Sequence, residues 1–506
     1  MKGKSGRFSA RLFLATVLVL IPAFVLAGGF ENFEKQVTEH TLKNGIRLLI
    51  LKRSDVPTVS FITWANVGSV NEVKGATGLA HLFEHMAFKG TKTVGTKDFN
   101  AEMKAMAKED SAFNDYLKEK LKGQLADSIR LKQLEKAWRD AVQASKKYVV
   151  SNELGEAIQR AGGVGLNAST NADATVYMYN LPSNRIELWM SLESDRFLNP
   201  VLREFYTERD VVMEERRLRT DSQPVGTLLE QFIATAYMAH PYSHPVVGYM
   251  SDLQALTRAK ARKFFKTYYV PQNLVLAIVG DVNVKKTIKM AETYFGRIPR
   301  APEPPKVVTV EPPQPGERIV EVENSSQPIL IMGFHRPAEL DKNSAVLDVI
   351  NDVLGQGRTS WLYKSLVKKD KIAIQTGAIS SITYGKYPGL FIFYAVVAKG
   401  HTNDECEKAI WKQIERIKTT PLSDKELGAV KTRARVNFLR QLQSNQGLAL
   451  QLAWAETILG DYHQLFRQVD KINAVTKEDI QRVAKNIFVK RNCTVGKIVK
   501  PETASK

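Results

Sequence analysis

Residues 78–91 read GLAHLFEHMAFKGT and contain two histidines four positions apart, His81 and His85. Apolar residues surround both histidines, which predicts a helix that begins after Gly78. Residues three and four apart lie on one face of a helix, so both imidazoles can reach a single metal ion. Glu84 lies one turn from His81, where its carboxylate can hold a metal-bound water and accept its proton.

Zinc is the ion that fits this pattern best. Two imidazoles and a carboxylate fill three positions of a tetrahedral site and leave the fourth for water, as in catalytic zinc sites. The alternative is that the two histidines and Glu84 belong to a solvated helix face. Because Leu, Phe, Met and Ala flank them, burial without a shared ion would be costly. We therefore expect one Zn²⁺ per chain.

The third ligand must come from another segment, and the acidic residues of 204–219 are the candidates. This segment is predicted to be helical, and Glu208 and Glu215 share a face because they are seven residues apart. One can ligate the metal while the other orients an imidazole. The residues alone do not decide between Glu214 and Glu215.

Residues 1–27 predict a signal peptide and therefore an exported protein. Four basic residues precede an apolar run from Leu12 to Ala27. Val25 and Ala27 stand where signal peptidase reads the −3 and −1 positions. A retained membrane anchor is the alternative, because this run approaches the length of a membrane span. We expect cleavage, no stable membrane span afterwards, and a periplasmic or secreted mature chain.

Composition excludes several classes of protein. The chain has 506 residues, of which 44% are hydrophobic and 25% charged, so it is not mainly disordered and is long enough for several domains. The formal net charge is +19, but the basic residues are dispersed and do not interleave with aromatic ones, so nucleic-acid binding is not expected. Two cysteines exclude a disulfide scaffold, and whether Cys406 and Cys493 pair stays open.

A proline-rich segment at 299–316 divides the chain. Seven prolines within 17 residues exclude a helix or a central strand, so this segment is predicted to be an extended linker. It separates a zinc-carrying catalytic domain at 30–298 from a second, non-catalytic domain at 317–506. Both parts end with a helical stretch followed by a strand, Leu274–Val279 in one and Thr494–Val499 in the other. Both also open with a β-rich stretch that leads into a helix, which indicates a duplicated domain.

The first part is longer because of a charged segment at about 101–149. Apolar residues recur there at helical spacing, which predicts an inserted helical hairpin with one side solvated. They are spaced by four at Leu117, Leu121, Leu125 and Ile129, and by three and four at Leu131, Leu134, Trp138 and Val142. Elsewhere strand-like and helix-like stretches alternate at hairpin-sized spacings. We therefore predict an α+β fold of two duplicated domains, each a mostly antiparallel sheet packed with helices.

Three blocks of the sequence resemble the pitrilysin family of zinc metallopeptidases, the inverzincins, which includes mitochondrial processing peptidase and exported bacterial relatives. Residues 78–91 are similar to the family's inverted zinc motif, HxxEH. Residues 208–215, ERDVVMEE, resemble its downstream acidic helix. Residues 165–177 resemble the edge strand that pairs with substrate. The likeness extends from about Phe33 to Val499.

The resemblance implies a role for each candidate residue. In the metal site it implies three zinc ligands and, beside them, a carboxylate that orients an imidazole. On the edge strand it implies main-chain hydrogen bonds to an extended peptide or unfolded segment, which adds to the sheet as a further strand. The matching residues are Glu84 as catalytic base, His81, His85 and Glu215 as ligands, Glu208 beside them, and Asn167 and Ala168 on the strand.

Two departures from the family bear on the expected partner. His85 and Glu215 are 130 positions apart, wider than is usual, which the insert at 101–149 explains. The family's two-part enzymes also carry an Arg and a Tyr, seven residues apart, in the non-catalytic half. Val367 and Ile374 stand at those places here. We therefore expect a homodimer, or a heterodimer with a related subunit that supplies the Arg/Tyr pair.

Together these features predict an exported zinc metalloendopeptidase that cleaves peptides or unfolded segments with metal-activated water. The alternative is a non-catalytic peptide-binding or assembly subunit, because related folds serve as core subunits of respiratory complexes. All four metal-site positions are intact here, which favours the enzyme.

Overall fold

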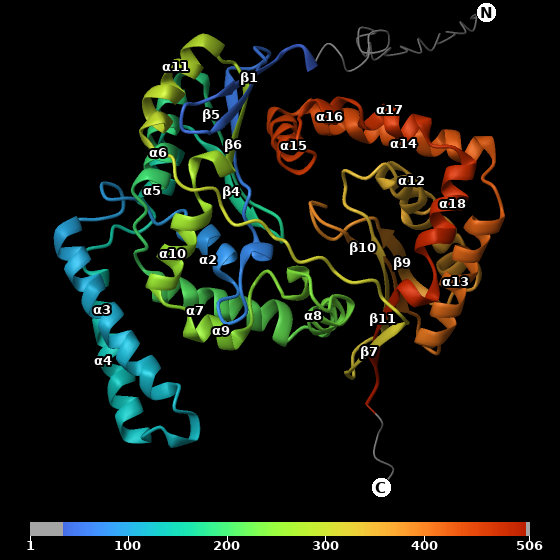
Figure 1. Ribbon diagram of the computed structural model, residues 1–506, viewed down its shortest axis with the longest axis horizontal. Coiled ribbons are helices and arrows are strands. Elements are labelled where there is room, and N and C mark those ends of the chain that lie inside the picture. Colours follow the sequence, from blue (N-terminus) through green and yellow to red (C-terminus); the bar gives the residue numbers. More distant parts are fainter. Residues whose placement is uncertain (1–33, 502–506) are drawn as a thin grey trace, which may run out of the picture.

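The computed structural model describes residues 34–501, in which the chain forms two halves, each built on one β-sheet (Figure 1). The signal peptide predicted for residues 1–27 lies outside the described residues. Within the described range, no helix is both long enough and apolar enough to cross a bilayer.

The first half contains a six-stranded sheet with the order β1-β2-β6-β3-β5-β4. Its strands are β1 (Val37–Thr41), β2 (Arg47–Lys52), β3 (Thr58–Ala65), β4 (Val164–Thr170), β5 (Thr175–Pro182) and β6 (Leu274–Gly280). β2 pairs with β6 in parallel, and the other described pairings are antiparallel. β4 lies at the end of the sheet, so one of its edges is free for pairing.

The second half repeats this arrangement in a five-stranded sheet with the order β7-β11-β8-β10-β9. Its strands are β7 (Arg318–Glu323), β8 (Ile329–Arg336), β9 (Ala373–Ile379), β10 (Gly389–Val397) and β11 (Cys493–Val499). β7 and β11 are parallel and the other described pairings antiparallel. The sheets therefore match strand by strand from β2 to β4 and from β7 to β9. This match confirms the predicted duplication and the α+β fold.

Helices surround both sheets (Figure 1). Those of the first half are α2 (Leu79–Met86), α3 (Phe99–Lys120), α4 (Ser128–Lys146), α5 (Glu153–Arg160), α6 (Ile186–Leu198), α7 (Phe205–Arg216), α8 (Pro224–Ala236), α9 (Met250–Ala255), α10 (Arg258–Tyr268) and α11 (Val284–Tyr294). Those of the second half are α12 (Ser344–Gly355), α13 (Asn403–Thr419), α14 (Asp424–Gln443), α15 (Asn445–Ile458), α16 (His463–Phe466), α17 (Gln468–Ala474) and α18 (Lys477–Ile487).

One helix of each half packs on the sheet of the other half. α15 of the second half packs on β3 and β6 of the first, and α8 of the first half packs on β7 and β11 of the second (Figure 1). The interface under α15 buries Trp64 with Leu452, and the interface under α8 buries Phe232 with Ile331. Both faces of each sheet are thus covered, which explains why every residue of β6 is buried.

The proline-rich segment at 299–316 contains neither helix nor strand, and it is anchored to both halves. Glu311 accepts hydrogen bonds from the backbone N–H groups of Met238, Ala239 and His240 at 2.7–2.9 Å. The side-chain amide of Gln314 donates to the carbonyl of Cys493 at 2.7 Å. The segment is therefore an ordered strap.

The insert forms the predicted helical hairpin, α3 and α4, which projects from the first half (Figure 1). Its helices meet through aromatic side chains, with the rings of Phe113 and Trp138 5.1 Å apart. The first part of the predicted apolar stripe is wrong, because Leu121, Leu125 and Ile129 are 69–88% exposed. The spacing by four continues through the turn at Gly123 (φ +58°), where the chain leaves one helix before entering the next. The second part is confirmed at Trp138, which is 4% exposed, and at Val142, which packs against the core.

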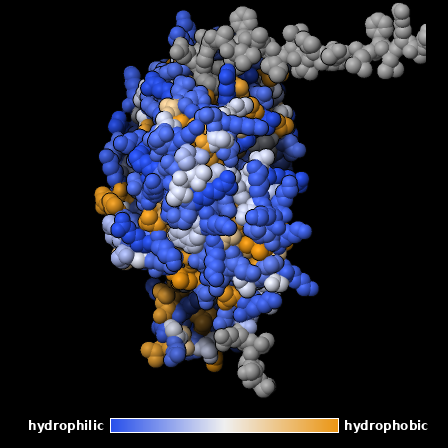
Figure 2. All heavy atoms as spheres, turned by 90° about the vertical axis from the view of Figure 1, so that its right-hand side faces the viewer, coloured by the Kyte–Doolittle hydropathy of each residue, from blue (hydrophilic) through white to orange (hydrophobic). Residues whose placement is uncertain are grey.

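The helices of the second half turn a mostly hydrophilic surface outward, with apolar residues scattered over it (Figure 2). α13 shows how this surface arises, since it buries Ile410, Ile414 and Ile417 and keeps charged residues between them. Cys406 of α13 and Cys493 of β11 lie buried in the same core as free thiols, so they do not pair in this structure.

Gly333 of β8 is required by the close approach of α8. A Cβ at this position would lie 2.5 Å from the ring of Phe232. We predict that Gly333→Ala lowers the free energy of unfolding by about 1–3 kcal/mol, because the buried ring must shift. Gly428→Ala in α14 is the matched control: a Cβ there meets no described atom within 4 Å, and the change should stabilise by up to about 1 kcal/mol. Equal denaturant midpoints for both variants would contradict this packing.

Candidate metal centre

α2 carries the two histidines and is fixed at its beginning by a buried carboxylate. Gly78 precedes the helix in the left-handed region (φ +87°). Glu72 then accepts hydrogen bonds from the N–H groups of Gly78 and Ala80 at 2.8 and 2.7 Å. These bonds satisfy donors that the helix itself leaves free, and burial raises the pKa of Glu72 to about 8. Glu72 was not predicted, since it lies outside the short spacing of capping motifs.

α7 carries the acidic residues and is joined to α2 by Arg203. This side chain is 1% exposed and donates to the carbonyls of Lys89, Thr91 and Val94, which follow α2. It also donates to both carboxylate oxygens of Glu102 in α3 at 2.8 and 3.1 Å. The base of the insert is therefore part of the scaffold that aligns α2 with α7.

Three ligand atoms converge where the two helices meet. The side chains of His81, His85 and Glu215 place one such atom each within 4.8 Å of one another. Glu215 Oε2 lies 3.6 Å from His81 Nε2 and 3.3 Å from His85 Nε2. Glu214, the alternative left open by the sequence, is exposed and pairs with Arg217 instead. The tertiary structure thus brings Glu215, and not its neighbour, to the histidines.

Further charges orient these side chains. Glu208 Oε2 lies 3.5 Å from His85 Nδ1, while its Oε1 is 2.6 Å from Lys89 Nζ. This contact holds a proton on Nδ1 and leaves Nε2 to face the centre. Arg219 Nη1 lies 2.5 Å from Glu215 Oε1, so Oε2 is the oxygen turned to the histidines. Lys89 and Arg219 were not predicted, although Arg219 follows Glu215 by four residues, a spacing typical of helical ion pairs.

The electrostatics favour a cation at this place. Burial lowers the pKa of His81 to about 4, so its imidazole is neutral at neutral pH. The hydrogen bond with Glu208 raises the pKa of His85. Burial raises the pKa of Glu208, but its hydrogen bonds with His85 and Lys89 outweigh this effect, and the pKa is lowered. Two imidazole nitrogens and a carboxylate oxygen that face one another suit a shared Zn²⁺.

Glu84 lies next to the edge strand β4, against which its helix α2 packs. Thr170, the last residue of β4, lies near the Glu84 carboxylate for this reason. Burial raises the pKa of Glu84, and Thr170 opposes the shift. Thr170 lies within a block that was compared with the family's edge strand, but its position near Glu84 depends on the packing of α2 against β4.

Asn167 and Ala168 lie on β4, as predicted from the resemblance. Asn167 pairs with Met178 and Ala168 with Tyr177 of β5, after an irregularity between Val164 and Asn167. Asn167 is exposed and Ala168 is 8% exposed. The opposite edge of the strand is free for pairing within the described sheet.

The remaining histidines near the site are structural. His240 Nδ1 accepts from the N–H of Tyr242 at 3.2 Å, and His244 Nε2 lies 2.8 Å from the carbonyl of Ser69. Both are buried, and neither joins the metal-ligand cluster found among the described residues.

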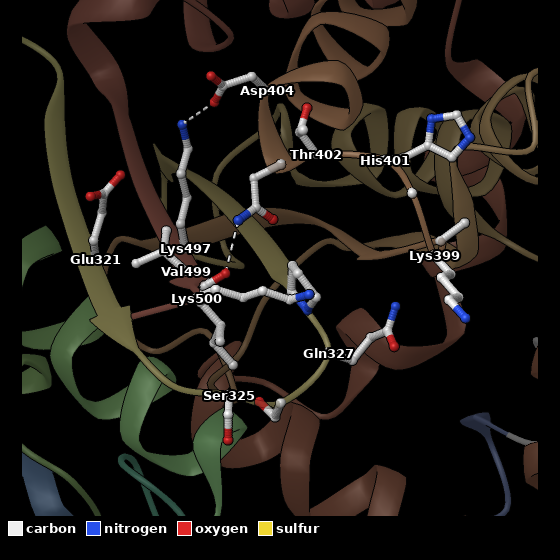
Figure 3. Close-up of a pocket in the computed structure, with 16 residues that line it drawn as sticks. Glu321, Ser325, Gln327, Lys399, His401, Thr402, Asp404, Lys497, Val499 and Lys500 are labelled. Atoms are coloured by element: carbon white, nitrogen blue, oxygen red, sulfur yellow. Dashed lines mark hydrogen bonds and ion pairs between the residues drawn. The ribbon is translucent and has the colours of Figure 1, made fainter. Parts of the chain in front are cut away.

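A separate pocket of about 590 Å³ lies in the second half, where β11 ends and α13 begins (Figure 3). Its basic residues include Lys399, Lys497 and Lys500, but Lys497 is paired with Asp404 at 2.8 Å. Its described lining residues come from the second half alone. It therefore contributes nothing to the metal centre.

Two family models match the chain in sequence. The model described as Insulinase (Peptidase family M16) matches residues 48–126 and 139–249, and the Peptidase M16 inactive domain matches residues 255–434. Together they match more than half of the chain. The chain belongs to peptidase family M16. This confirms the resemblance to the pitrilysin family, and the unmatched residues 127–138 include the start of α4 in the insert.

Relatives of this M16 protein are named zinc proteases. Zinc protease PqqE of Helicobacter pylori is 29% identical over 455 residues, covering 87% of this chain and 88% of that one. The uncharacterized zinc protease YmxG of Bacillus subtilis is 21% identical and covers 89% and 96%. The crystal structure of a protease from H. pylori has a TM-score of 0.76 at 26% identity and covers 92% of this chain and 99% of that one. These relatives support an M16 protease and suggest zinc as its metal.

We predict that Glu208→Gln weakens zinc binding by about 10–100-fold, because His85 loses the carboxylate that orients it. Competition with a chromophoric chelator measures this affinity. Glu214→Gln, six residues further along the same helix, is the matched control and should bind zinc as the unaltered chain does. A similar loss in both variants would argue against a specific role for Glu208.

Proposed function

We propose that this protein is a zinc-dependent endopeptidase acting on extended peptides or unfolded segments. The observation that carries the proposal is the convergence of His81, His85 and Glu215 on one point, with Glu84 on the same helix as the histidines and that helix packed against the edge strand β4. An imidazole-carboxylate centre next to a strand edge joins hydrolytic chemistry to main-chain recognition.

The two histidines and Glu215 would hold the metal. Zinc bound there supplies a Lewis acid that polarises a carbonyl group and lowers the pKa of water. Glu208 keeps His85 in the tautomer that presents Nε2, and Arg219 keeps Glu215 turned to the same point. The chain thus provides both the ligands and the groups that orient them.

Glu84 acts as the general base in this proposal. Its carboxylate accepts a proton from the attacking water and then delivers it to the amine that leaves. Burial raises the pKa of Glu84, and Thr170 at the end of β4 opposes this rise.

The substrate pairs with β4 as an added strand. Asn167 and Ala168 offer backbone groups along the free edge, so recognition depends mainly on an extended main chain. Since Thr170 ends the same strand, a peptide paired with β4 passes close to Glu84. Folded proteins, whose backbone groups are already paired, would be poor substrates.

A second subunit closes over the site in this proposal. Val367 and Ile374 stand at the places of the family's Arg and Tyr, so a homodimer or a related partner would supply the missing pair. Exposed aliphatic side chains on α7, the turn after it and α8 offer a surface for such contact: Val211, Leu218, Val225 and Leu229. If two subunits must assemble, the rate of cleavage should increase more than in proportion to the enzyme concentration.

In this proposal the enzyme acts in the periplasm or outside the cell. The basic and apolar pattern of residues 1–27 supports export. One structural neighbour, the first half of the periplasmic protease PqqL from Escherichia coli, has a TM-score of 0.67 at 16% identity, which is a likeness of fold.

We predict that the mature chain cleaves quenched-fluorescence peptides and that a metal chelator abolishes this activity, which zinc restores. Glu84→Gln should retain zinc and lose at least about 100-fold in kcat, because the amide cannot accept the proton. His85→Ala should lose zinc as well. Metal content by atomic emission and initial rates measure both quantities.

A Glu84→Gln variant that cleaves at the unaltered rate would refute the assigned base. A folded, zinc-loaded chain that binds peptides without cleaving them, alone or with its partner, would favour the alternative of a peptide-binding or assembly subunit.

A further inference from the structure

The hairpin of α3 and α4 ends in three large aliphatic side chains that face solvent. They surround the turn between the two helices and are 69–88% exposed: Leu121, Leu125 and Ile129. The hairpin projects from the first half, so this turn lies far from both sheets (Figure 1). A single exposed aliphatic residue needs no explanation, whereas three of them at the end of a projecting arm indicate a contact surface.

The arm that carries the turn is rigid. The rings of Phe113 in α3 and Trp138 in α4 pack together, and both side chains are buried. Arg258 of α10, which is itself fully buried, donates to the Glu109 carboxylate of α3 at 2.9 Å. Leu121 follows Phe113 by eight residues, which places it about 12 Å further along the helix. The turn is therefore held at a defined place outside the core.

Positive charge is concentrated around the same turn. Residues 118–132 contain five basic and two acidic residues, whereas the rest of the two helices carries slightly more acidic than basic residues. Both acidic residues are engaged, since Glu119 pairs with Lys122 at 2.7 Å and Arg130 at 3.6 Å, and Asp127 caps α4. The turn therefore keeps an excess of positive charge. Its basic residues are Lys118, Lys120, Lys122, Arg130 and Lys132.

Aliphatic side chains ringed by basic ones match the surface of an anionic bilayer. The aliphatic groups can enter the boundary between headgroups and acyl chains, while the long basic side chains stay among the phosphates. The polar backbone of the turn limits this insertion to a shallow depth. A narrow, convex turn suits a soft layer that closes around it, whereas a protein partner would have to offer an acidic groove of matching shape.

We propose that the turn between α3 and α4, residues 118–132, is a peripheral contact with an anionic lipid bilayer. The three aliphatic side chains enter the interface, and the basic side chains bind the phosphate groups of the lipids. Residues 127–138 lie outside the match to the family model, so the family does not imply this contact. The inference goes beyond the proposed peptidase function, because lipid binding requires no cleavage.

Vesicle sedimentation tests the contact with the mature chain, which lacks the apolar run at 12–27. We expect vesicles of phosphatidylglycerol and phosphatidylcholine in equal parts to bind at least about tenfold more tightly than phosphatidylcholine alone, and less tightly as salt is added. Leu125→Ser should weaken this binding about threefold, because less apolar surface enters the interface. The triple change with Leu121→Ser and Ile129→Ser should weaken it at least about tenfold.

Leu340→Ser is the matched control for these changes. Leu340 is a 60% exposed leucine that follows β8 in the second half, and its variant should bind the mixed vesicles as the unaltered chain does. Lys122→Gln combined with Lys132→Gln tests the charge. This double variant should bind the mixed vesicles at least about fivefold more weakly, with no change toward phosphatidylcholine alone.

An environment-sensitive dye reports insertion directly. Attached at Leu125→Cys, its emission should shift to the blue with the mixed vesicles, whereas the same dye at Leu340→Cys should not respond. Cys406 and Cys493 are fully buried, so the introduced thiol is the one that reacts.

The whole chain is strongly basic, so vesicle binding supports the proposal only where the turn is responsible for it. Binding that the triple variant leaves unaltered would overturn the proposal, and so would an unshifted emission at position 125. A dimer that the triple variant dissociates without lipid would assign the turn to contact between copies and overturn it as well. Neither readout uses cleavage, so a failure of the peptidase proposal leaves the outcome of this test unaffected.

Discussion

Each sheet of this protein has two apolar faces and requires a helix from the other half to cover one of them. Neighbouring residues of β3, Phe61 and Ile62, belong to different cores because side chains alternate along a strand. α15 covers the second face of this sheet, and α8 does the same for the other sheet. Burial of one large apolar side chain contributes about 1.5–3 kcal/mol. A handful of such contacts approaches the net stability of a typical domain, about 5–15 kcal/mol, so the halves are held as one body.

The elements around the metal centre are held by packing within the first half and between the two halves. Within the first half, Arg203 joins α7 to the loop after α2 and to the insert, which aligns the helix carrying the histidines with the helix carrying Glu215. Between the halves, the loop that joins β9 to β10 is supported by α15, whose Trp454 donates to the carbonyl of Tyr384. The match to a domain described as inactive, residues 255–434, falls mostly in the second half. This half contacts the turn between β4 and β5, where the backbone N–H of Lys386 donates to Asp173.

Much of the fold and part of the site were predictable from local patterns. The strand at 274–279 and the helical hairpin were expected because apolar periodicity and proline placement act over short distances. The exposure of Leu121 and Leu125 was not predicted. Their spacing by four continues across a turn, and periodicity alone does not show where one helix ends and the next begins. The roles implied for Glu208, Asn167 and Ala168 came from family likeness. In the structure Glu208 lies beside His85, and Asn167 and Ala168 lie on the edge strand β4.

The sequence by itself determined which residues can share a metal ion on one helix face, because the pitch of a helix places His81 beside His85 wherever the helix packs. It also determined the duplication, since strand and helix patterns recur on both sides of the proline-rich strap. Spacing alone left Glu214 and Glu215 open and the resemblance named Glu215, whereas the tertiary structure shows the Glu215 carboxylate facing both histidines. The tertiary structure alone brought Lys386 to Asn66 across more than 300 residues. Such contacts depend on how whole elements pack, and no local pattern encodes that packing.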